Sequence, residues 1–190
     1  MDPEAILHDT INVYILAVIV SLSTAGILGY FSNYVVTWLM FIYIIVDLVW
    51  IVYIPKAIPS LQPLIVLHHI AVIGLVTHPL LYPEDAIWTS LDALVELNTI
   101  GLLGRRQRLG QSIGFPQAIW FLLYWASFLT LRLSVYPWLL WKFSEVLIVA
   151  KYGLFRRWLV LSCQAVLCMF NLGFLFLSLR HRKSKGARFG

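Results

Sequence analysis

Apolar residues in this chain come in blocks of about 20, and short polar or Gly/Pro-containing stretches separate the blocks. A helix needs about 20 mostly apolar residues to cross a hydrocarbon core of roughly 30 Å. We therefore expect six membrane-spanning helices, because prolines and arginine clusters interrupt the apolar pattern between them. Their expected ranges are residues 11–31, 34–54, 63–81, 86–103, 115–134 and 155–179.

The stretch 138–152 does not fit this pattern cleanly. It is apolar but short, it follows Pro137, and it contains Lys142 and Glu145. A segment of this length favours an interfacial or re-entrant helix, and the alternative is a seventh, short span.

The composition supports a membrane protein. Of the 190 residues, 61% are hydrophobic and only 12% are charged, whereas a soluble domain has roughly 45–50% apolar and about 25% charged residues. These values exclude a soluble globular enzyme, a disordered protein and a disulfide-rich module. We predict an all-α fold, a single transmembrane helical bundle over residues 1–190, in which any chemistry lies inside the bundle.

The charges are distributed very unevenly. All but one of the 9 acidic residues precede residue 105, and all but one of the 14 Lys and Arg residues lie from Arg105 onward. With six spans, Lys56, the arginines at 105–108 and a basic tail at 180–190 share one side with both termini. The positive-inside rule then predicts cytosolic termini. The membrane is expected to be that of the endoplasmic reticulum or the plasma membrane. The tail is expected to contact anionic lipid headgroups, and no folded basic surface for nucleic acid is expected.

Several ionisable side chains lie inside the predicted spans. Each costs about 2.5–3.5 kcal/mol to insert at the centre of a helix, so such residues are candidates for function. This set consists of Asp47, His68, His69, Asp92 and Glu96. No metal site is expected from them, and Cys163 and Cys168 are interpreted as packing residues. His8 and His181 are expected in solvent, and His78 at the membrane interface.

The polar residues of four predicted spans fall at a similar depth. With a rise of 1.5 Å per residue, Asp47, the His68–His69 pair and Glu96 lie about 8–10 Å from the same end of the bundle, and Asn171 about 12 Å. We therefore expect them around one cavity. Asp92 and Glu96 share a helix face at i, i+4, where two carboxylates can serve as acid and base. A contact near the opposite rim is nevertheless favoured for Asp92, and Arg132 is expected near that rim too.

The order of these motifs resembles the TLC-domain family, which includes ceramide synthases and TRAM proteins, and is most similar to its small members. The resemblance covers residues 10–182 and rests on YIIVDLVWIVYIP, VLHHIAVIG, LDALVELNTIGLLGRR, an Arg in the next helix and FNLGFLFLSLR. It implies a six-helix bundle with a cavity open to the cytosolic leaflet. The sequence departs from the family where Glu96-Leu97-Asn98-Thr99-Ile100 replaces Glu-x-Ser-Thr-Pro.

The resemblance also implies roles for individual residues. In ceramide synthases a His pair and a nearby Asp transfer an acyl group from acyl-CoA, so His68 or His69 would be the base or acyl acceptor and Asp47 would hold its tautomer. Glu96 completes the catalytic candidates, and acyl-CoA would be a co-substrate without a further cofactor. Substrate-binding candidates are Asp92, Asn98, Arg132 and Asn171.

Three functions stay open at this point. The first is a protein that binds a lipid or acyl chain in an intramembrane cavity and so regulates membrane lipid composition. The second is an acyltransferase of the ceramide-synthase type that uses His68 or His69. The third is a proton-coupled transporter, because the composition does not exclude a proton path.

Overall fold

The computed structural model describes residues 2–58, 62–107, 116–149 and 153–186, and within these ranges the chain is helical apart from short turns and links. The elements are α1 (Pro3–Ile27), α2 (Asn33–Tyr53), η1 (Pro55–Ala57), α3 (Gln62–Leu81), η2 (Pro83–Asp85), α4 (Ala86–Ala93), α5 (Glu96–Gln107), α7 (Gln117–Ser127), η3 (Phe128–Val135), α8 (Tyr136–Val149) and α9 (Leu154–Gly186). Six helical stretches among the described residues are long and apolar enough to cross a membrane. This confirms the predicted all-α bundle of six spans.

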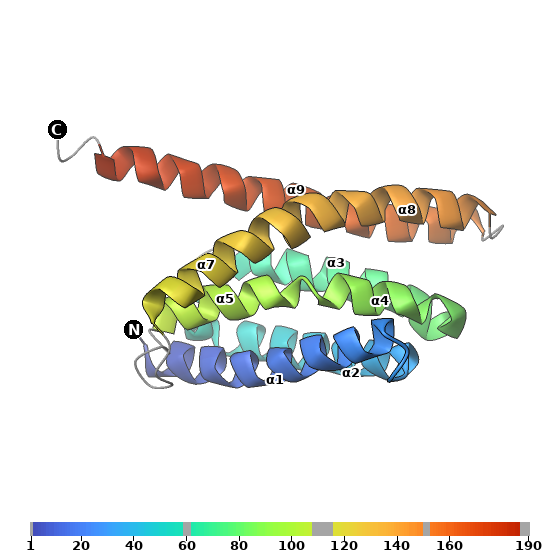
Figure 1. Cartoon of the computed structure of the whole chain (residues 1–190), viewed down its shortest axis with the longest axis horizontal. Coiled ribbons are helices and arrows are strands. Elements are labelled where there is room, and N and C mark those ends of the chain that lie inside the picture. Colours follow the sequence, from blue (N-terminus) through green and yellow to red (C-terminus); the bar gives the residue numbers. More distant parts are fainter. Residues whose placement is uncertain (1, 59–61, 108–115, 150–152, 187–190) are drawn as a thin grey trace.

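The helices stack in layers (Figure 1). Helices α1 and α2 lie on one side, α3, α4 and α5 form the middle, and α8 and α9 lie on the other side. Helix α7 crosses obliquely from the middle layer, where it packs on α5, to the third layer. Helix α9 packs on α3 and α8 and then extends beyond its neighbours. The first turns of α1 and the last turns of α5 therefore meet at the same end of the bundle.

Helix α1 begins at Pro3, eight residues before the predicted start at residue 11. Asp2 is its N-cap, and the carboxylate accepts a 3.1 Å hydrogen bond from the backbone N–H of Glu4. Proline suits the first helical position because its fixed φ is helical and its missing N–H would have no partner there. The early start adds His8 and Asp9 to the first span, next to Asn12, which the predicted range already includes.

The fourth span is a helix with an interruption. Helix α4 ends at Ala93, and α5 begins at Glu96 after a tight turn. The N–H of Asn98 donates to the carbonyl of Val95 at 2.9 Å, an i→i+3 bond that tightens this turn. The predicted single helix over 86–103 is therefore two helices in line.

The predicted break after residue 134 was wrong, and so were the separate segment and the alternative seventh span at 138–152. The π-helical segment η3 joins α7 and α8 into one continuous helix, and residues Gln117–Ile148 of this helix form a single candidate membrane span. The N–H of Tyr136 donates to the carbonyl of Leu131, five residues earlier. A wider turn of this kind accommodates Pro137, whose ring would otherwise clash with the carbonyl four residues before it. The chain therefore continues through this proline as a helix.

Helices α5 and α7 approach each other closely because small residues of α5 face α7. A Cβ atom added to Gly101 would lie 2.9 Å from the backbone nitrogen of Tyr124, and one added to Gly104 would overlap the ring of Trp120. Asn98 stands one turn before Gly101, and its amide Nδ2 donates to the carbonyl of Tyr124 at 2.8 Å. Backbone proximity and this hydrogen bond together fix α7 against α5.

We predict that Gly101→Ala destabilises the bundle by about 1–3 kcal/mol, because the new methyl group meets backbone that has no room to move. This loss is expected even though Ala is a better helix former than Gly by about 1 kcal/mol. The matched control is Gly173→Ala in α9, where an added Cβ meets nothing within 4 Å. Denaturation in mixed detergent micelles measures both variants, and a Gly101→Ala protein at least as stable as wild type contradicts the packing described.

Candidate functional site

A cavity of about 310 Å³ opens near the end of the bundle where α1 begins. We call it the chamber. Helices α1, α2, α3, α5 and α7, together with η3 and α9, contribute to its lining. Its polar lining consists of His8, Asp9, Asn12, Asp47, His68, His69, Glu96, Asn98, Thr99, Arg106 and Arg132. Its aromatic and aliphatic lining consists of Tyr43, Ile44, Ile58, Ile65, Leu102, Leu103, Tyr124, Phe128, Phe170 and Phe174.

Asp47 lies at the centre of the polar contacts. Its Oδ1 lies 2.9 Å from His8 Nε2 and accepts a 2.9 Å hydrogen bond from Asn12 Nδ2. Its Oδ2 lies 2.7 Å from His69 Nε2. A carboxylate that is only 6% exposed in an apolar bundle is tolerated because donors surround it. These contacts connect α2 with α1 on one side and with α3 on the other.

The two adjacent histidines have different environments. His69 is engaged at both ring nitrogens, because Nδ1 donates to the carbonyl of Ile65 at 2.8 Å and Nε2 meets Asp47. His68 points elsewhere: its ring packs 4.9 Å from the ring of Phe170, and its buried Nδ1 has no hydrogen-bond partner among the described residues. Asp47 therefore orients His69, whereas His68 keeps a ring nitrogen free for another group.

The expectation that His8 lies in solvent was wrong. His8 is 3% exposed and bridges two carboxylates, with Nε2 at Asp47 and Nδ1 3.5 Å from Asp9 Oδ1. Asp9 is fully buried and accepts two hydrogen bonds from Arg106, one of them from Nε at 2.6 Å. The Arg106 side chain is 35% exposed, so it marks the outer end of the chamber. His8 and Asp9 are buried because α1 begins at Pro3, so that both residues belong to the helix and face the interior of the bundle.

Arg132 lines the chamber rather than the opposite rim, which corrects the sequence-based expectation. Its Nη1 donates to Asn171 Oδ1 at 3.0 Å and its Nη2 to Thr99 Oγ1 at 2.9 Å. Both acceptors are neutral, and the buried Nε has no partner among the described residues. The continuous helix through η3 explains the difference, because Arg132 lies in the middle of that helix and not near its end. Asn171 is 1% exposed and holds Arg132 in place.

The remaining candidates divide between the chamber and regions beyond it. Glu96 is 7% exposed and lines the chamber. Asn98 also lines it, but its Nδ2 is used to hold Tyr124 and Ser127 of α7. Asp92 does not line the chamber; it faces two smaller cavities on the far side of Glu96. The structure therefore brings Asp47, His68, His69 and Glu96 together, as their similar depth predicts. The same expectation was wrong for Asn171, which does not line the chamber and lies behind Arg132, to which it is hydrogen-bonded. Asp92 also lies apart from the chamber.

His78 lies near the end of α3, as predicted, and its side chain is buried. It is 8% exposed, and its Nε2 lies 2.9 Å from Asp85 Oδ2. A lone histidine before a proline gave no sign of this partner, which lies seven residues further along the chain in η2.

Two parts of the chamber were missed by sequence reasoning although a local signal exists. The order Asp2-Pro3-Glu4 is a helix start signal, since Asp is a favoured N-cap and Pro a favoured first helical residue. Reading it would have extended the first span to include His8 and Asp9. No comparable local signal shows that Arg106 pairs with Asp9, because the pair joins residues far apart in sequence.

The basic tail lies outside what the structure describes at side-chain level. This applies to the side chains of Arg180, His181, Arg182, Lys183 and Lys185, to Arg188, and also to Arg108. The predicted contact between the tail and anionic headgroups therefore stays a prediction. Among the side chains that are described, no group of three or more His, Cys, Asp or Glu residues is arranged to hold a metal ion.

Comparisons of the chain with protein-family models, with curated proteins and with solved structures found no match. The geometry of the chamber is therefore the basis for a functional proposal.

We predict that Asp47→Ala destabilises the protein by about 3–5 kcal/mol, because it leaves His8, Asn12 and His69 without their shared acceptor. Glu145→Gln is the control, since Glu145 forms an exposed pair with Lys142 whose loss costs about 0–1 kcal/mol. Thermal or denaturant unfolding in detergent measures both variants. If Asp47→Ala unfolded at the same midpoint as Glu145→Gln, the carboxylate would not be the contact that holds α1, α2 and α3 together.

Proposed function

We propose that this multi-pass membrane protein binds a lipid or an acyl chain in the chamber and thereby regulates membrane lipid composition. The observation that supports this most directly is a cavity of about 310 Å³ within a bundle of apolar spans. Ligand pockets in proteins have volumes of roughly 300–1,000 Å³ and combine apolar walls with a few polar groups. The chamber has both features, and its surroundings supply lipids as the most abundant ligands.

The apolar part of the lining suits a hydrocarbon chain. Phe170 and Phe174 of α9, Phe128 of η3 and Leu102 of α5 line the chamber. Each methylene group that leaves water for such a surface contributes about 0.8 kcal/mol. A bound acyl chain would therefore gain most of its affinity from these residues.

The polar part of the lining suits a headgroup. Asp47 and His69 already satisfy one another, so the residues with unused capacity are His68, Glu96 and Arg132. Arg132 contacts neutral acceptors, so its charge is available to a carboxylate or phosphate oxygen of a ligand. Glu96 offers an acceptor to a hydroxyl or amine of the same ligand.

The resemblance of these motifs to the TLC-domain family agrees with lipid handling, and it is the reason for placing the protein in the endoplasmic reticulum or plasma membrane. Cytosolic termini would open the chamber to the cytosolic leaflet, because Arg106 at its outer end lies close to the start of α1.

Acyl transfer is a second candidate function, favoured by the free nitrogen of His68. In this reaction a ring nitrogen of His68 takes the proton of a lipid amine or hydroxyl as that group attacks the thioester carbonyl of acyl-CoA. The carbon–sulfur bond of the thioester breaks, and the protonated His68 gives its proton to the departing sulfur, so coenzyme A leaves as the thiol, the acyl lipid is the product and His68 is neutral again. Arg132 would stabilise negative charge on the carbonyl oxygen. In this version His69 and Asp47 position the neighbouring backbone, because both nitrogens of His69 are already engaged.

Lipid binding predicts that wild-type protein co-purifies with lipid and that filling the chamber removes it. Leu102→Trp adds bulk to the chamber wall and should lower bound lipid several-fold, as measured by mass spectrometry of the purified protein. Leu122→Trp is the matched control because Leu122 is 68% exposed and does not line the chamber. Equal lipid content in both variants would contradict binding in the chamber.

Acyl transfer predicts product when the purified protein is incubated with acyl-CoA and a sphingoid base or lysophospholipid. His68→Ala should abolish the product while lipid still co-purifies with the protein. An absence of product from wild-type protein that does carry lipid leaves binding as the function and rejects the enzyme.

A further inference from the structure

The polar interior of the protein continues beyond the chamber. Two smaller cavities follow it towards the opposite end of the bundle. The middle cavity, of about 10 Å³, includes Glu96, Asp92 and Thr89 in its lining. The far cavity, of about 30 Å³, includes Asp92 and Thr89 again, together with His78 and Asp85. Glu96 is thus shared by the chamber and the middle cavity, and Asp92 and Thr89 are shared by the middle and far cavities.

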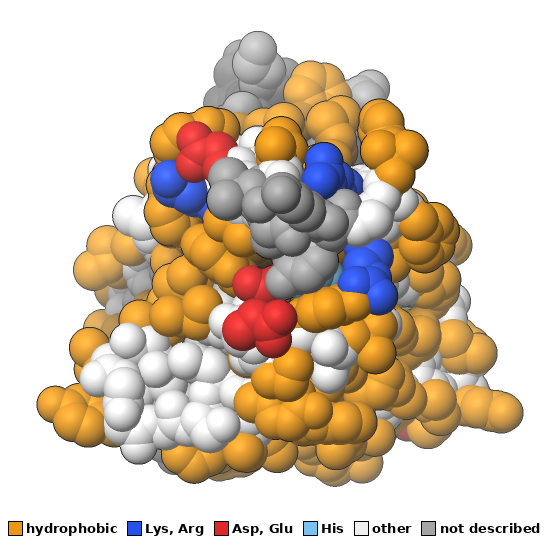
Figure 2. Space-filling view, turned by 90° about the vertical axis from the view of Figure 1, so that its right-hand side faces the viewer, with side chains coloured by type: hydrophobic (Ala, Val, Ile, Leu, Met, Phe, Trp, Pro, Cys, Tyr) orange, Lys and Arg blue, Asp and Glu red, His pale blue; other side chains and the backbone are white. Residues whose placement is uncertain are grey.

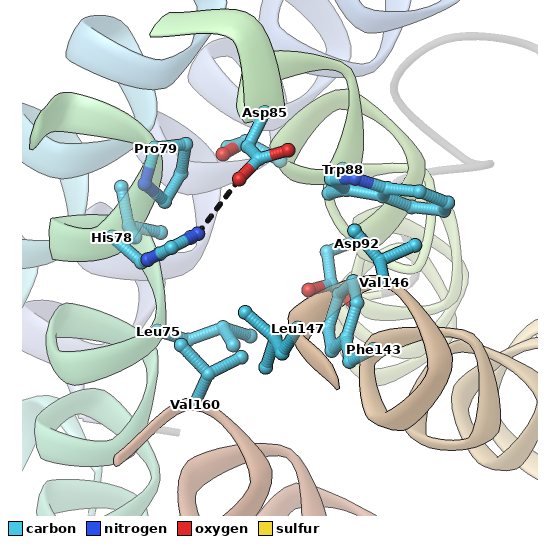
Figure 3. A pocket seen from close by; sticks show the side chains of 12 residues that line it. Leu75, His78, Pro79, Asp85, Trp88, Asp92, Phe143, Val146, Leu147 and Val160 are labelled. Atoms are coloured by element: carbon cyan, nitrogen blue, oxygen red, sulfur yellow. Dashed lines mark hydrogen bonds and ion pairs between the residues drawn. The ribbon is translucent and has the colours of Figure 1, made fainter. Parts of the chain in front are cut away.

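Figure 3 shows the far cavity at close range. The imidazole of His78 reaches across to the carboxylate of Asp85 on one side. The carboxylate of Asp92 lies on the other side, below Trp88, and is turned towards the space between them. Asp85 ends η2, and Asp92 lies seven residues further along the chain in α4, which corresponds to about 10 Å of helical rise at 1.5 Å per residue. A chain of hydrogen bonds through the far cavity would carry a proton over such a rise.

Two buried polar atoms that belong to residues lining both cavities lack a hydrogen-bond partner among the described residues. Thr89 is 4% exposed, yet its Oγ1 has no hydrogen-bond partner among the described residues, and the same holds for Asp92 Oδ1. Gln164 does not line either cavity, but its fully buried side chain hydrogen-bonds with that of Asp92, and its Oε1 has no partner among the described residues. Leaving such a group unpaired costs about 1–3 kcal/mol. Water molecules are the partners that fit, because one water needs roughly 10–15 Å³ of cavity volume and several polar neighbours.

We propose that the two small cavities hold water and that protons move through them between the chamber and the opposite end of the bundle. A proton enters at the His78–Asp85 pair, passes through water to Asp92 and Thr89, and continues through the middle cavity to Glu96. Each step transfers one proton along a hydrogen bond while another leaves on the far side, so no redox partner or leaving group is involved. The flux is driven by a difference in proton activity across the membrane.

The surface at the outer end of this pathway suits the entry of a cation. Figure 2 shows that acidic side chains lie near the middle of the end face opposite the start of α1, and that Lys and Arg side chains lie around them on the same face. Glu84, beside Asp85 in η2, is exposed and supplies a surface carboxylate next to the buried one. Negative charge at the entrance of a low-dielectric passage raises the local concentration of protons.

The titratable groups around Asp92 come from several helices. Glu96 of α5 and Tyr136 of α8 line the middle cavity with it. Cys168 of α9 lies within electrostatic range of it, and His78 and Asp85 face it across the far cavity. Asp92 lines both the middle and the far cavity, and its carboxyl group can carry a proton. The pathway therefore depends on this carboxyl group.

The test uses the full-length protein in phosphatidylcholine–phosphatidylglycerol vesicles that contain a pH-sensitive dye. A proton gradient is imposed, and valinomycin with potassium compensates the charge that moves. We expect acidification several-fold faster than in protein-free vesicles. Asp92→Asn, which is nearly isosteric but cannot relay a proton as a carboxyl group does, should reduce the rate to the protein-free level. Thr89→Val, which removes the hydroxyl, should also slow it.

Two controls separate this pathway from the other properties of the protein. Glu145→Gln changes an exposed carboxylate and should conduct as wild type does. Asp92→Asn should retain its co-purified lipid because Asp92 does not line the chamber, so a failure of the pathway is distinguishable from a failure of lipid binding. Wild-type vesicles no faster than protein-free ones overturn the proposal, and so does an Asp92→Asn protein as fast as wild type. If Asp92→Asn does not fold, Thr89→Val decides in the same way.

Discussion

The structure depends on how the bundle accommodates one carboxylate, that of Asp47. An isolated ionised group in an apolar interior is unfavourable by many kcal/mol, so it persists only where donors surround it. Here the donors come from His8 and Asn12 on α1 and from His69 on α3. One side chain of α2 thereby fixes the relative positions of α1, α2 and α3, and the chamber forms where these helices meet.

The spans were predictable because membrane insertion depends on hydrophobicity summed over about 20 residues, which local detail does not change. The helices Asn33–Tyr53 and Gln62–Leu81 match the predicted ranges within one residue at each end. The depth argument worked for Asp47, His68 and His69 for the same reason, since it was measured from these well-defined ends. Hydropathy, however, does not indicate where α1 begins, because its first turns contain polar residues. It therefore gave no sign that His8 is buried.

The error at Arg132 has a different physical origin. Pro137 normally ends a helix, so the predicted span stopped before it and Arg132 fell near a rim. The wider turn of η3 keeps the helix continuous, although π-helical i→i+5 hydrogen bonds are rare in proteins. Whether such a turn forms depends on tertiary contacts, and the hydrogen bonds of Arg132 to Thr99 and Asn171 supply them. These contacts join three spans that are distant in sequence, so no local pattern encodes them.

The polar residues of the interior divide by whether their hydrogen bonds are complete. The hydrogen bonds of Asp47 and His69 are complete, and these two residues hold helices in place. Arg132 Nε, His68 Nδ1 and Asp92 Oδ1 have no partner among the described residues. In water an unused donor or acceptor costs nothing, but inside a membrane-embedded bundle it costs free energy at every moment in which nothing binds it. A fold that keeps such atoms next to cavities is more stable with those cavities filled than empty. Residues with unpartnered polar atoms therefore indicate where ligand, water or protons interact with the protein. Residues whose hydrogen bonds are complete indicate which contacts keep these cavities open.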